Sequence, residues 1–246
     1  MLFPKINLHI HSIYSDGRND IGTIVKRTIK LEFNFIAITD HFSNAWKSGV
    51  IKTLDSSKKI NLYLEEIEHQ NDYLIGKNVN LKILKGIEID LGSSYKYIEK
   101  LIDPNRFDLI LLEYLEDSES IGFINNLIRS WKNKIQNDNP FPILGLAHFD
   151  PSHFAYKNTQ TLFNFMESNQ IYYEFNSAYS NYYSKKYQEI FFDKLKEYDI
   201  PVGIGSDSHN INELKFIEEP FEMIKYYGLE KNYTLLITTL NEFKHQ

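Results

Sequence analysis

The stretch Val202-Gly-Ile-Gly-Ser-Asp-Ser-His-Asn210 is a short apolar run that ends in an aspartate and a histidine two residues apart. A similar run near the start of the chain, Ile6-Asn-Leu-His-Ile-His-Ser12, ends in two histidines. Side chains two apart on a strand point to the same face, so His9 and His11 can reach one ion. The same holds for Asp207 and His209, and both segments are predicted to be strands that end in metal ligands.

Three more apolar runs end in possible ligands. The run 35–41 ends in Asp40 and His41, the run 84–88 ends in Glu88, and the run 143–148 ends in His148. Five of the eight histidines thus lie at or just past a predicted strand end. Parallel strands bring their carboxyl ends to one edge, so a common rim of ligands is expected.

The length and composition indicate one folded domain over residues 1–246. Apolar residues make up 42% and charged residues 24% of the chain, which is ordinary for a globular protein. No 18-residue apolar segment and no signal-peptide pattern occur, so a cytoplasmic protein without membrane contact is expected. With no cysteine in the chain, the available metal ligands are imidazole and carboxylate, which suit hard or borderline divalent ions.

The net charge of −6 argues against a long nucleic-acid surface and favours a small anionic substrate. Nucleic acid is therefore possible but not favoured as a partner, and the oligomeric state is left open.

Strand and helix patterns alternate along the chain, which predicts an α/β barrel or a doubly wound sheet. Ligands at five strand ends favour a TIM-like (β/α)7 barrel, because a barrel gathers nearly all strand ends around one mouth. The expected strands lie near 5–11, 35–40, 81–88, 107–112, 143–147, 171–176 and 202–206. The expected helices lie near 20–32, 56–76, 94–102, 119–136, 158–168, 184–198, 212–227 and 233–244.

The ligand set is larger than one ion can use, so two or three metal ions must share it. Glu88 can bridge two cations, and paired cations lower the pKa of a shared water to give hydroxide near neutral pH. Hydrolysis of a phosphate ester is the reaction that this arrangement suits best. The candidate ligands are His9, His11, Asp16, Asp40, His41, Glu88, His148, Asp207 and His209.

These motifs, in this order over residues 7 to 210, resemble those of the PHP (polymerase and histidinol phosphatase) family. The resemblance rests on 9–12, 15–17, 38–41, 86–88, His148 and 205–209. It implies a distorted seven-stranded barrel, a trinuclear centre of Mn, Fe or Zn, and phosphoesterase activity. The segment 173–177 also resembles histidinol-phosphatase-like members, which favours the phosphatase branch over the polymerase-associated one.

The resemblance also implies how the ligands divide among the ions. His9, His11, Glu88 and Asp207 would hold the first ion; Asp16, His41 and His209 the second; Glu88 and His148 would help to hold the third. Many members have a histidine after the strand that here ends in Glu113. Either Glu113 substitutes as an oxygen ligand, which would favour Mn over Zn, or the third ion is weakly bound or absent.

Other polar residues are candidates for roles beside the metals. The expected catalytic group is Asp207, His209, Arg18 and His153, with His153 either touching the leaving group or capping the next helix. Arg18, Lys47 and Lys185 are candidates for binding phosphate, although an ordinary surface position is the better interpretation of each. Asp40 is expected to orient an imidazole rather than to bind metal directly.

The remaining candidates are aromatic, amide and histidine side chains. The tyrosine-rich stretch 172–187 offers rings for stacking on a base, with core packing as the more frequent use of such a cluster. Asn176 shares a strand face with Glu174 and is within reach of the site. His69, within an acidic helix, and His245, near the C-terminus, are expected at the surface.

Three hypotheses follow for the function. The first is a hydrolase of a small phosphomonoester, such as histidinol phosphate or a nucleotide, in which a metal-bridging hydroxide attacks phosphorus. The second is a nuclease for single-stranded DNA or short RNA, suggested by the tyrosines. The third and weakest is a metal-binding scaffold without turnover. An amidohydrolase is disfavoured, because it usually has a bridging lysine and another order of ligands.

Overall fold

The computed structural model describes residues 3–135, 139–154, 159–184 and 189–243, and in them the strands form a parallel sheet. The spatial order is β1-β2-β4-β5-β6-β7-β8, with β3 paired to β4 beyond the end of β2. The strands are β1 (Ile6–Asn7), β2 (Phe35–Ile38), β3 (His41–Phe42), β4 (Lys82–Asp90), β5 (Leu109–Glu113), β6 (Ile143–Leu146), β7 (Tyr172–Asn176) and β8 (Val202–Gly205).

Backbone hydrogen bonds between the first and last strands nearly close this sheet into a barrel. The Leu8 N–H donates to the Ile204 carbonyl at 2.8 Å, and the His11 N–H donates to the Ser208 carbonyl at 2.9 Å. These bonds join segments almost 200 residues apart, which confirms the predicted distorted (β/α)7 TIM-like barrel.

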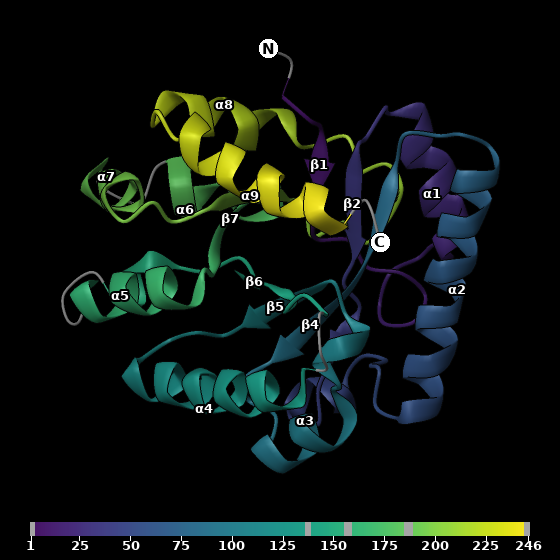
Figure 1. The fold of residues 1–246 in the computed structure, drawn as a ribbon, viewed down its shortest axis with the longest axis horizontal. Helices are drawn as coiled ribbons and strands as arrows, with labels where there is room; N and C mark the ends of the chain where they lie inside the picture. The colour runs from purple at the N-terminus through teal and green to yellow at the C-terminus, as the bar shows by residue number, and fades with distance from the viewer. Residues whose placement is uncertain (1–2, 136–138, 155–158, 185–188, 244–246) are drawn as a thin grey trace.

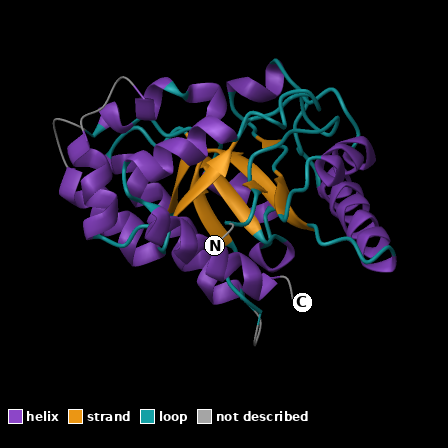
Figure 2. Ribbon diagram, turned by 90° about the horizontal axis from the view of Figure 1, so that it is seen from above, coloured by secondary structure: helices purple, strands orange, loops and turns teal. Residues whose placement is uncertain are grey.

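Helices pack around the strands, as Figures 1 and 2 show. Several begin at side chains that suit a helix start: the Asp20 carboxylate, for example, accepts the Thr23 N–H at 2.7 Å. No helix among the described residues has the length and apolar character needed to cross a membrane. The helices are α1 (Ile21–Lys30), α2 (Ser57–Gly76), α3 (Tyr95–Leu101), α4 (Ser118–Lys134), α5 (Thr159–Asn169), α6 (Asn181–Ser184), α7 (Glu189–Glu197), α8 (Glu218–Tyr226) and α9 (Glu230–Glu242).

Two predicted elements differ from the structure, and both differences lie beside the ligands. The first strand ends at Asn7 because the Asn7 side chain accepts the His9 and Ser206 N–H groups, at 3.4 and 3.2 Å, in place of ladder carbonyls. The helix predicted over 212–227 begins only at Glu218. Before it, the Glu213 carboxylate accepts the His209 and Asn210 N–H groups and holds this segment in turns.

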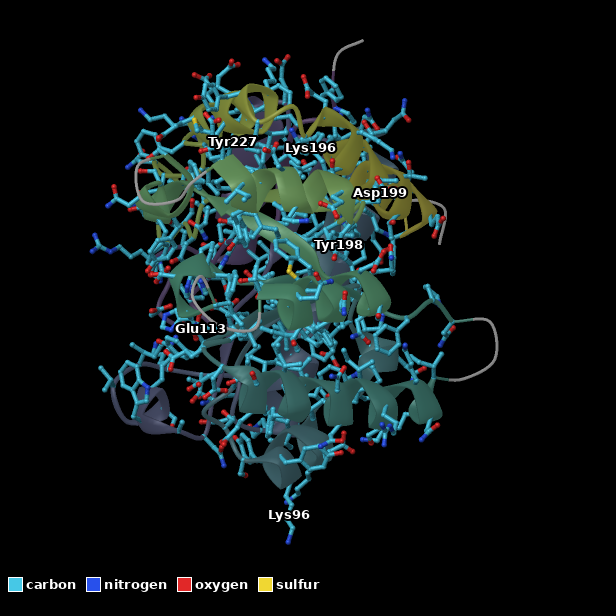
Figure 3. The ribbon with its side chains drawn as sticks, turned by 90° about the vertical axis from the view of Figure 1, so that its left-hand side faces the viewer. Lys96, Glu113, Lys196, Tyr198, Asp199 and Tyr227 are labelled. Atoms are coloured by element: carbon cyan, nitrogen blue, oxygen red, sulfur yellow. The ribbon has the colours of Figure 1, made fainter. Side chains whose placement is uncertain are left out.

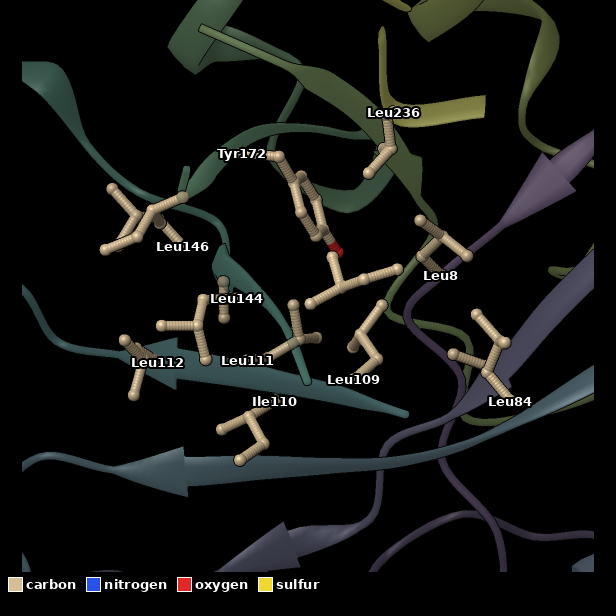
Figure 4. Close-up of a cluster of buried hydrophobic side chains, with 14 of the residues drawn as sticks. Leu8, Leu84, Leu109, Ile110, Leu111, Leu112, Leu144, Leu146, Tyr172 and Leu236 are labelled. Atoms are coloured by element: carbon tan, nitrogen blue, oxygen red, sulfur yellow. The ribbon is translucent and has the colours of Figure 1, made fainter. Parts of the chain in front are cut away.

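The interior of the barrel is apolar at the start of the strands and polar at their ends. Tyr172 lies among leucines of neighbouring strands (Figure 4), and a Cβ at Gly203 would stand only 2.8 Å from its ring. Two residues further along the same face of β7, Glu174 reaches the ligands instead. Figure 3 labels residues near both ends of the barrel: Glu113 is the last residue of β5, and Asp199 lies in the loop before β8.

Candidate metal centre

His9 is held by a carboxylate that the sequence analysis did not assign to the site. Glu174 Oε1 lies 2.9 Å from His9 Nδ1, and Glu174 Oε2 accepts the His148 N–H at 2.6 Å. Gly205 makes room for this carboxylate, because a Cβ there would overlap Glu174 Oε1. A carboxylate on one imidazole nitrogen orients the ring and leaves its other nitrogen free for metal.

The free nitrogens of His9 and His11 meet two carboxylates at the centre of the rim. His9 Nε2 lies 3.1 Å from His11 Nε2 and 3.3 Å from Glu88 Oε1. Asp207 Oδ1 lies 2.9 Å from His11 Nε2 and 3.5 Å from His9 Nε2. Ligands about 2.1 Å from a common tetrahedral ion lie roughly 3.4 Å apart. These four residues, expected for a first ion, therefore stand at ligand-to-ligand distances.

A second group lies nearer to solvent and contains Asp16, His41 and His209. Asp16 carboxylate oxygens lie 3.2 Å from His209 Nε2 and 3.7 Å from His41 Nε2. His209 Nδ1 donates to the Asp207 carbonyl at 2.8 Å, which leaves Nε2 as the available ligand. His11 also belongs to this cluster of mutually close donor atoms. The three residues expected for a second ion are thus brought together.

The residues expected for a third ion also converge, but a lysine lies among them. His148 Nε2 is 3.4 Å from Glu88 Oε1 and 3.4 Å from Glu113 Oε1. Lys47 Nζ lies 2.6 and 2.5 Å from the two Glu113 oxygens and 3.5 Å from His41 Nδ1. The expectation that Lys47 is an ordinary surface charge is therefore wrong, because its side chain is only 8% exposed.

The carboxylates and imidazoles of the centre shift one another's pKa values. Burial of Glu88 opposes its ionisation, but His41 and His9 outweigh this and hold its pKa well below the usual range. The Asp16 hydrogen bond is the largest influence on His209 and raises its pKa to about 9. Burial disfavours the charged form of His148, yet the nearby Glu113 and Glu88 carboxylates raise its pKa to about 10.

The donor set fits divalent cations. Glu88 is fully buried, and neither of its oxygens makes a well-directed hydrogen bond among the described residues. Imidazole nitrogens face these oxygens at 2.6 Å (His41 Nδ1) and 3.3 Å (His9 Nε2). A buried carboxylate without such bonds is costly unless a cation compensates it. Imidazole and carboxylate donors suit Zn, Fe and Mn.

Backbone strain marks two of the ligands. His148 has φ of 32° and Asp207 has φ of 49°, in the left-handed region that residues with a Cβ rarely adopt. Such conformations cost about 1–3 kcal/mol each and persist where the surroundings hold them. The Glu174 carboxylate that binds the His148 N–H is one of these constraints.

The remaining candidates lie at various distances from the centre. Among the described residues, Asp40 contacts no imidazole: its Oδ1 accepts the Ser12 N–H at 2.8 Å and the Ser15 N–H at 3.0 Å, which shapes the loop before Asp16. Asn176 does reach the site, with its amide 3.0 Å from Glu174 Oε2. Arg18 is exposed, and its backbone N–H donates to the His209 carbonyl at 2.8 Å.

Three tyrosines from the described part of the stretch 172–187 belong to the core. Tyr172, Tyr173 and Tyr183 are buried, which removes the stacking surface expected from them, while Tyr179 is partly buried and packs 4.5 Å from the His148 ring. His69 is exposed, as expected. Lys185 and His245 lie outside the described residues.

Two cavities open at the rim. The larger, about 840 Å³, is lined by Asp207 and His209 together with Lys215 and Phe216. The smaller, about 200 Å³, is lined by residues that include His148, His153 and Tyr179. His153 ends a short 3-10 helix, Pro151–His153, whose first turn is capped by Asp150. His153 itself is exposed at the mouth of this cavity.

The chain belongs to the PHP domain family, whose model matches residues 7–200. The fold resembles histidinol phosphate phosphatase from Lactococcus lactis, solved with zinc, L-histidinol and phosphate, at a TM-score of 0.59 and 16% identity. That match covers 91% of this chain and 94% of the other. It also resembles a chain from the crystal structures of YwqE from Bacillus subtilis and CpsB from Streptococcus pneumoniae, which are metal-dependent tyrosine phosphatases. The TM-score is 0.60 and the sequence identity 21%, and the match covers 95% of this chain and 92% of the other.

One curated relative is a much longer protein. The DNA polymerase/3'-5' exonuclease PolX of Bacillus subtilis is 33% identical over 89 residues. The matched segment is 35% of this chain but only 14% of PolX.

Proposed function

We propose that this protein is a metal-dependent hydrolase of a small phosphomonoester. The observation that carries the proposal is the position of Glu88, buried with both oxygens turned toward imidazoles of different ligand groups. Family membership supports it, and so does the likeness to phosphatases with a comparable fold. The proposal also includes a small phosphomonoester as the substrate, two or three divalent ions in the centre, and a location in the cytoplasm.

The chain's own residues would hold and orient the reactants. Divalent ions bound here would supply Lewis acidity and a water of lowered pKa, the nucleophile for an in-line displacement. Glu174 keeps His9 Nε2 turned to the centre, and the Asp207 carbonyl does the same for His209 Nε2. Attack of the water oxygen on phosphorus would form one P–O bond as the bond to the ester oxygen breaks, and the proton lost by the water would pass to the leaving oxygen, giving phosphate and a free hydroxyl compound.

Residues at the mouth would contact the rest of the substrate. Lys215 lines the larger cavity, and Arg18 is an exposed residue whose backbone N–H donates to the His209 carbonyl. Both are candidates for binding phosphate oxygens. His153 and Tyr179 line the smaller cavity and are candidates for contact with the leaving group.

The test compares hydrolysis of aryl phosphate, histidinol phosphate, phosphotyrosine peptide and a nucleoside monophosphate before and after Mn²⁺ addition. We expect monoester turnover that Mn²⁺ stimulates and that His9→Ala lowers by more than about 100-fold, beyond the usual loss of an outer-shell partner. His69→Ala is the matched control, because it removes an exposed histidine far from the rim. Metal-replete protein that leaves every monoester intact would sink the proposal.

A nuclease is the second candidate, and its support is the matched segment of the exonuclease PolX. The burial of three tyrosines weakens the stacking argument that first suggested it. A labelled single-stranded oligonucleotide and an aryl phosphodiester, assayed beside the monoesters, separate the two. Cleavage of the diesters at a higher kcat/KM than any monoester would favour the nuclease.

A further inference from the structure

Lys47 brings a buried positive charge into the rim. It lies in a short 3-10 helix, Trp46–Gly49, that follows β3. Its ammonium contacts both Glu113 oxygens, at 2.6 and 2.5 Å, and the two side chains are 8% and 3% exposed. The Tyr114 ring lies 5.1 Å from the ammonium and covers it further. This is a desolvated ion pair with both acceptor oxygens in use.

The ammonium lies on a group of donors that is otherwise arranged for a metal ion. Donor atoms of His41, Glu88 and Glu113 all lie within 4.8 Å of one another. A divalent ion at this group would bind Glu113 at about 2.0–2.2 Å. The Lys47 ammonium already lies on the same two oxygens, and 3.5 Å from His41 Nδ1. Because the ammonium takes both Glu113 oxygens, a metal ion could bind them only by displacing it.

The other two groups differ in this respect. Within the described part of the chain, Asp207 and Asp16 contact histidines and a serine, and no lysine or arginine is among these partners. Their negative charges are compensated only if imidazoles are protonated or ions bind. The lysine therefore distinguishes one of three otherwise similar groups.

We propose that the Lys47 ammonium takes the place of the third metal ion, so that the chain binds two divalent ions and supplies the third cation itself. The inference rests on the metal centre of the proposed function but not on its substrate. The lysine pairs with Glu113, the position at which a carboxylate stands where many family members have a histidine.

The experiment counts bound ions rather than turnover. Purified protein is stripped with chelator, equilibrated with Mn²⁺ by dialysis, and analysed for metal per chain. We expect two ions in the wild type and three in Lys47→Met, because removal of the ammonium frees Glu113 beside Glu88 and His148. Lys47→Arg keeps the charge and should bind two. The double variant Lys47→Met/Glu113→Gln loses a ligand of the opened group and should return to two.

Lys59→Met is the control for a general effect of losing a lysine, since Lys59 is exposed and paired with Asp55 away from the rim. It should bind two ions. Three ions in the wild type, or two in a folded Lys47→Met, would overturn the inference. If Lys47→Met does not fold, a Mn²⁺-loaded wild-type crystal decides: anomalous density between His41 and Glu113 contradicts the inference, and its absence beside two occupied groups supports it.

The outcomes for the two proposals are separable. Two ions per chain without hydrolysis of any phosphate ester would refute the proposed function and support the inference. Hydrolysis of a monoester with three ions would do the reverse. A chain that binds no ion at all would overturn both.

Discussion

The carboxylates on the two sides of Glu88, Asp207 and Glu113, have their negative charge neutralised in different ways. Toward β1 and β8, Asp207 faces His9 and His11, and no side chain there carries a permanent positive charge within the described contacts. Toward β5, Glu113 is paired with Lys47. The charge of Asp207 is balanced only by bound ions or by protonated imidazoles, whereas the charge of Glu113 is balanced by the Lys47 ammonium. Carboxylates at the same rim therefore differ in whether they need a bound metal ion to balance their charge.

The largest expected effect comes from removing the internal cation in the absence of metal. Lys47→Met leaves Glu113 buried without its partner, and loss of one member of a buried pair costs about 3–5 kcal/mol. Lys59→Met breaks an exposed pair, in which both side chains are 46% exposed, and should cost less than about 1 kcal/mol. Urea unfolding of both variants in chelator measures the difference. Equal, small losses would mean that the Lys47–Glu113 pair does not stabilise the fold.

The next effect concerns the carboxylate behind His9. Glu174→Gln keeps the shape of the side chain but removes the charge that orients the imidazole. Metal affinity should fall by about 10–100-fold, as for other outer-shell partners of a ligand. Calorimetric titration with Mn²⁺ measures the change, and Glu167→Gln, at an exposed position on α5, is the control. An unchanged affinity would show that packing alone positions His9.

The smallest effect is the dependence of the metal-free fold on pH. The pKa values of His209, about 9, and His148, about 10, are raised above the ordinary value of 6.5. Raised pKa values add stability that is complete below about pH 6.5 and is lost as pH rises through the folded-state values. Urea midpoints in chelator should therefore fall between pH 7 and 10. His209→Gln should flatten the first part of this fall, and a midpoint that rises over the range would contradict the assignment.

The sequence alone determined the class of fold and most of the ligands. Period-two spacing predicted that His9 and His11, and likewise Asp207 and His209, point the same way on a strand. In the structure β1 ends at Asn7 and β8 at Gly205, so all four follow the strands and still meet at the rim. Apolar runs that end in a ligand indicated parallel strands with a shared rim, which the structure shows. These features are local, because a strand's alternation and its end can be recognised from a few neighbouring residues.

Helix boundaries near the rim were less predictable, because side chains replaced regular pairing there. The helix expected from 212 begins at Glu218, after turns held by Glu213. Pro220 is compatible with this later start, since proline is tolerated in the first turn of a helix. The preceding residues satisfy the backbone of the ligand loop instead.

Only the tertiary structure decided which groups meet across the barrel. Glu174 was visible as a strand residue, but its contact with His9 joins positions 165 apart in the chain. Lys47 looked like an ordinary loop lysine until the fold placed it on Glu113, 66 residues away. Spacing along a strand fixes the direction of a side chain, whereas its partner depends on how distant strands and loops pack. For that reason the sequence determined a rim of ligands, and the three-dimensional packing decided which of them already have a cation.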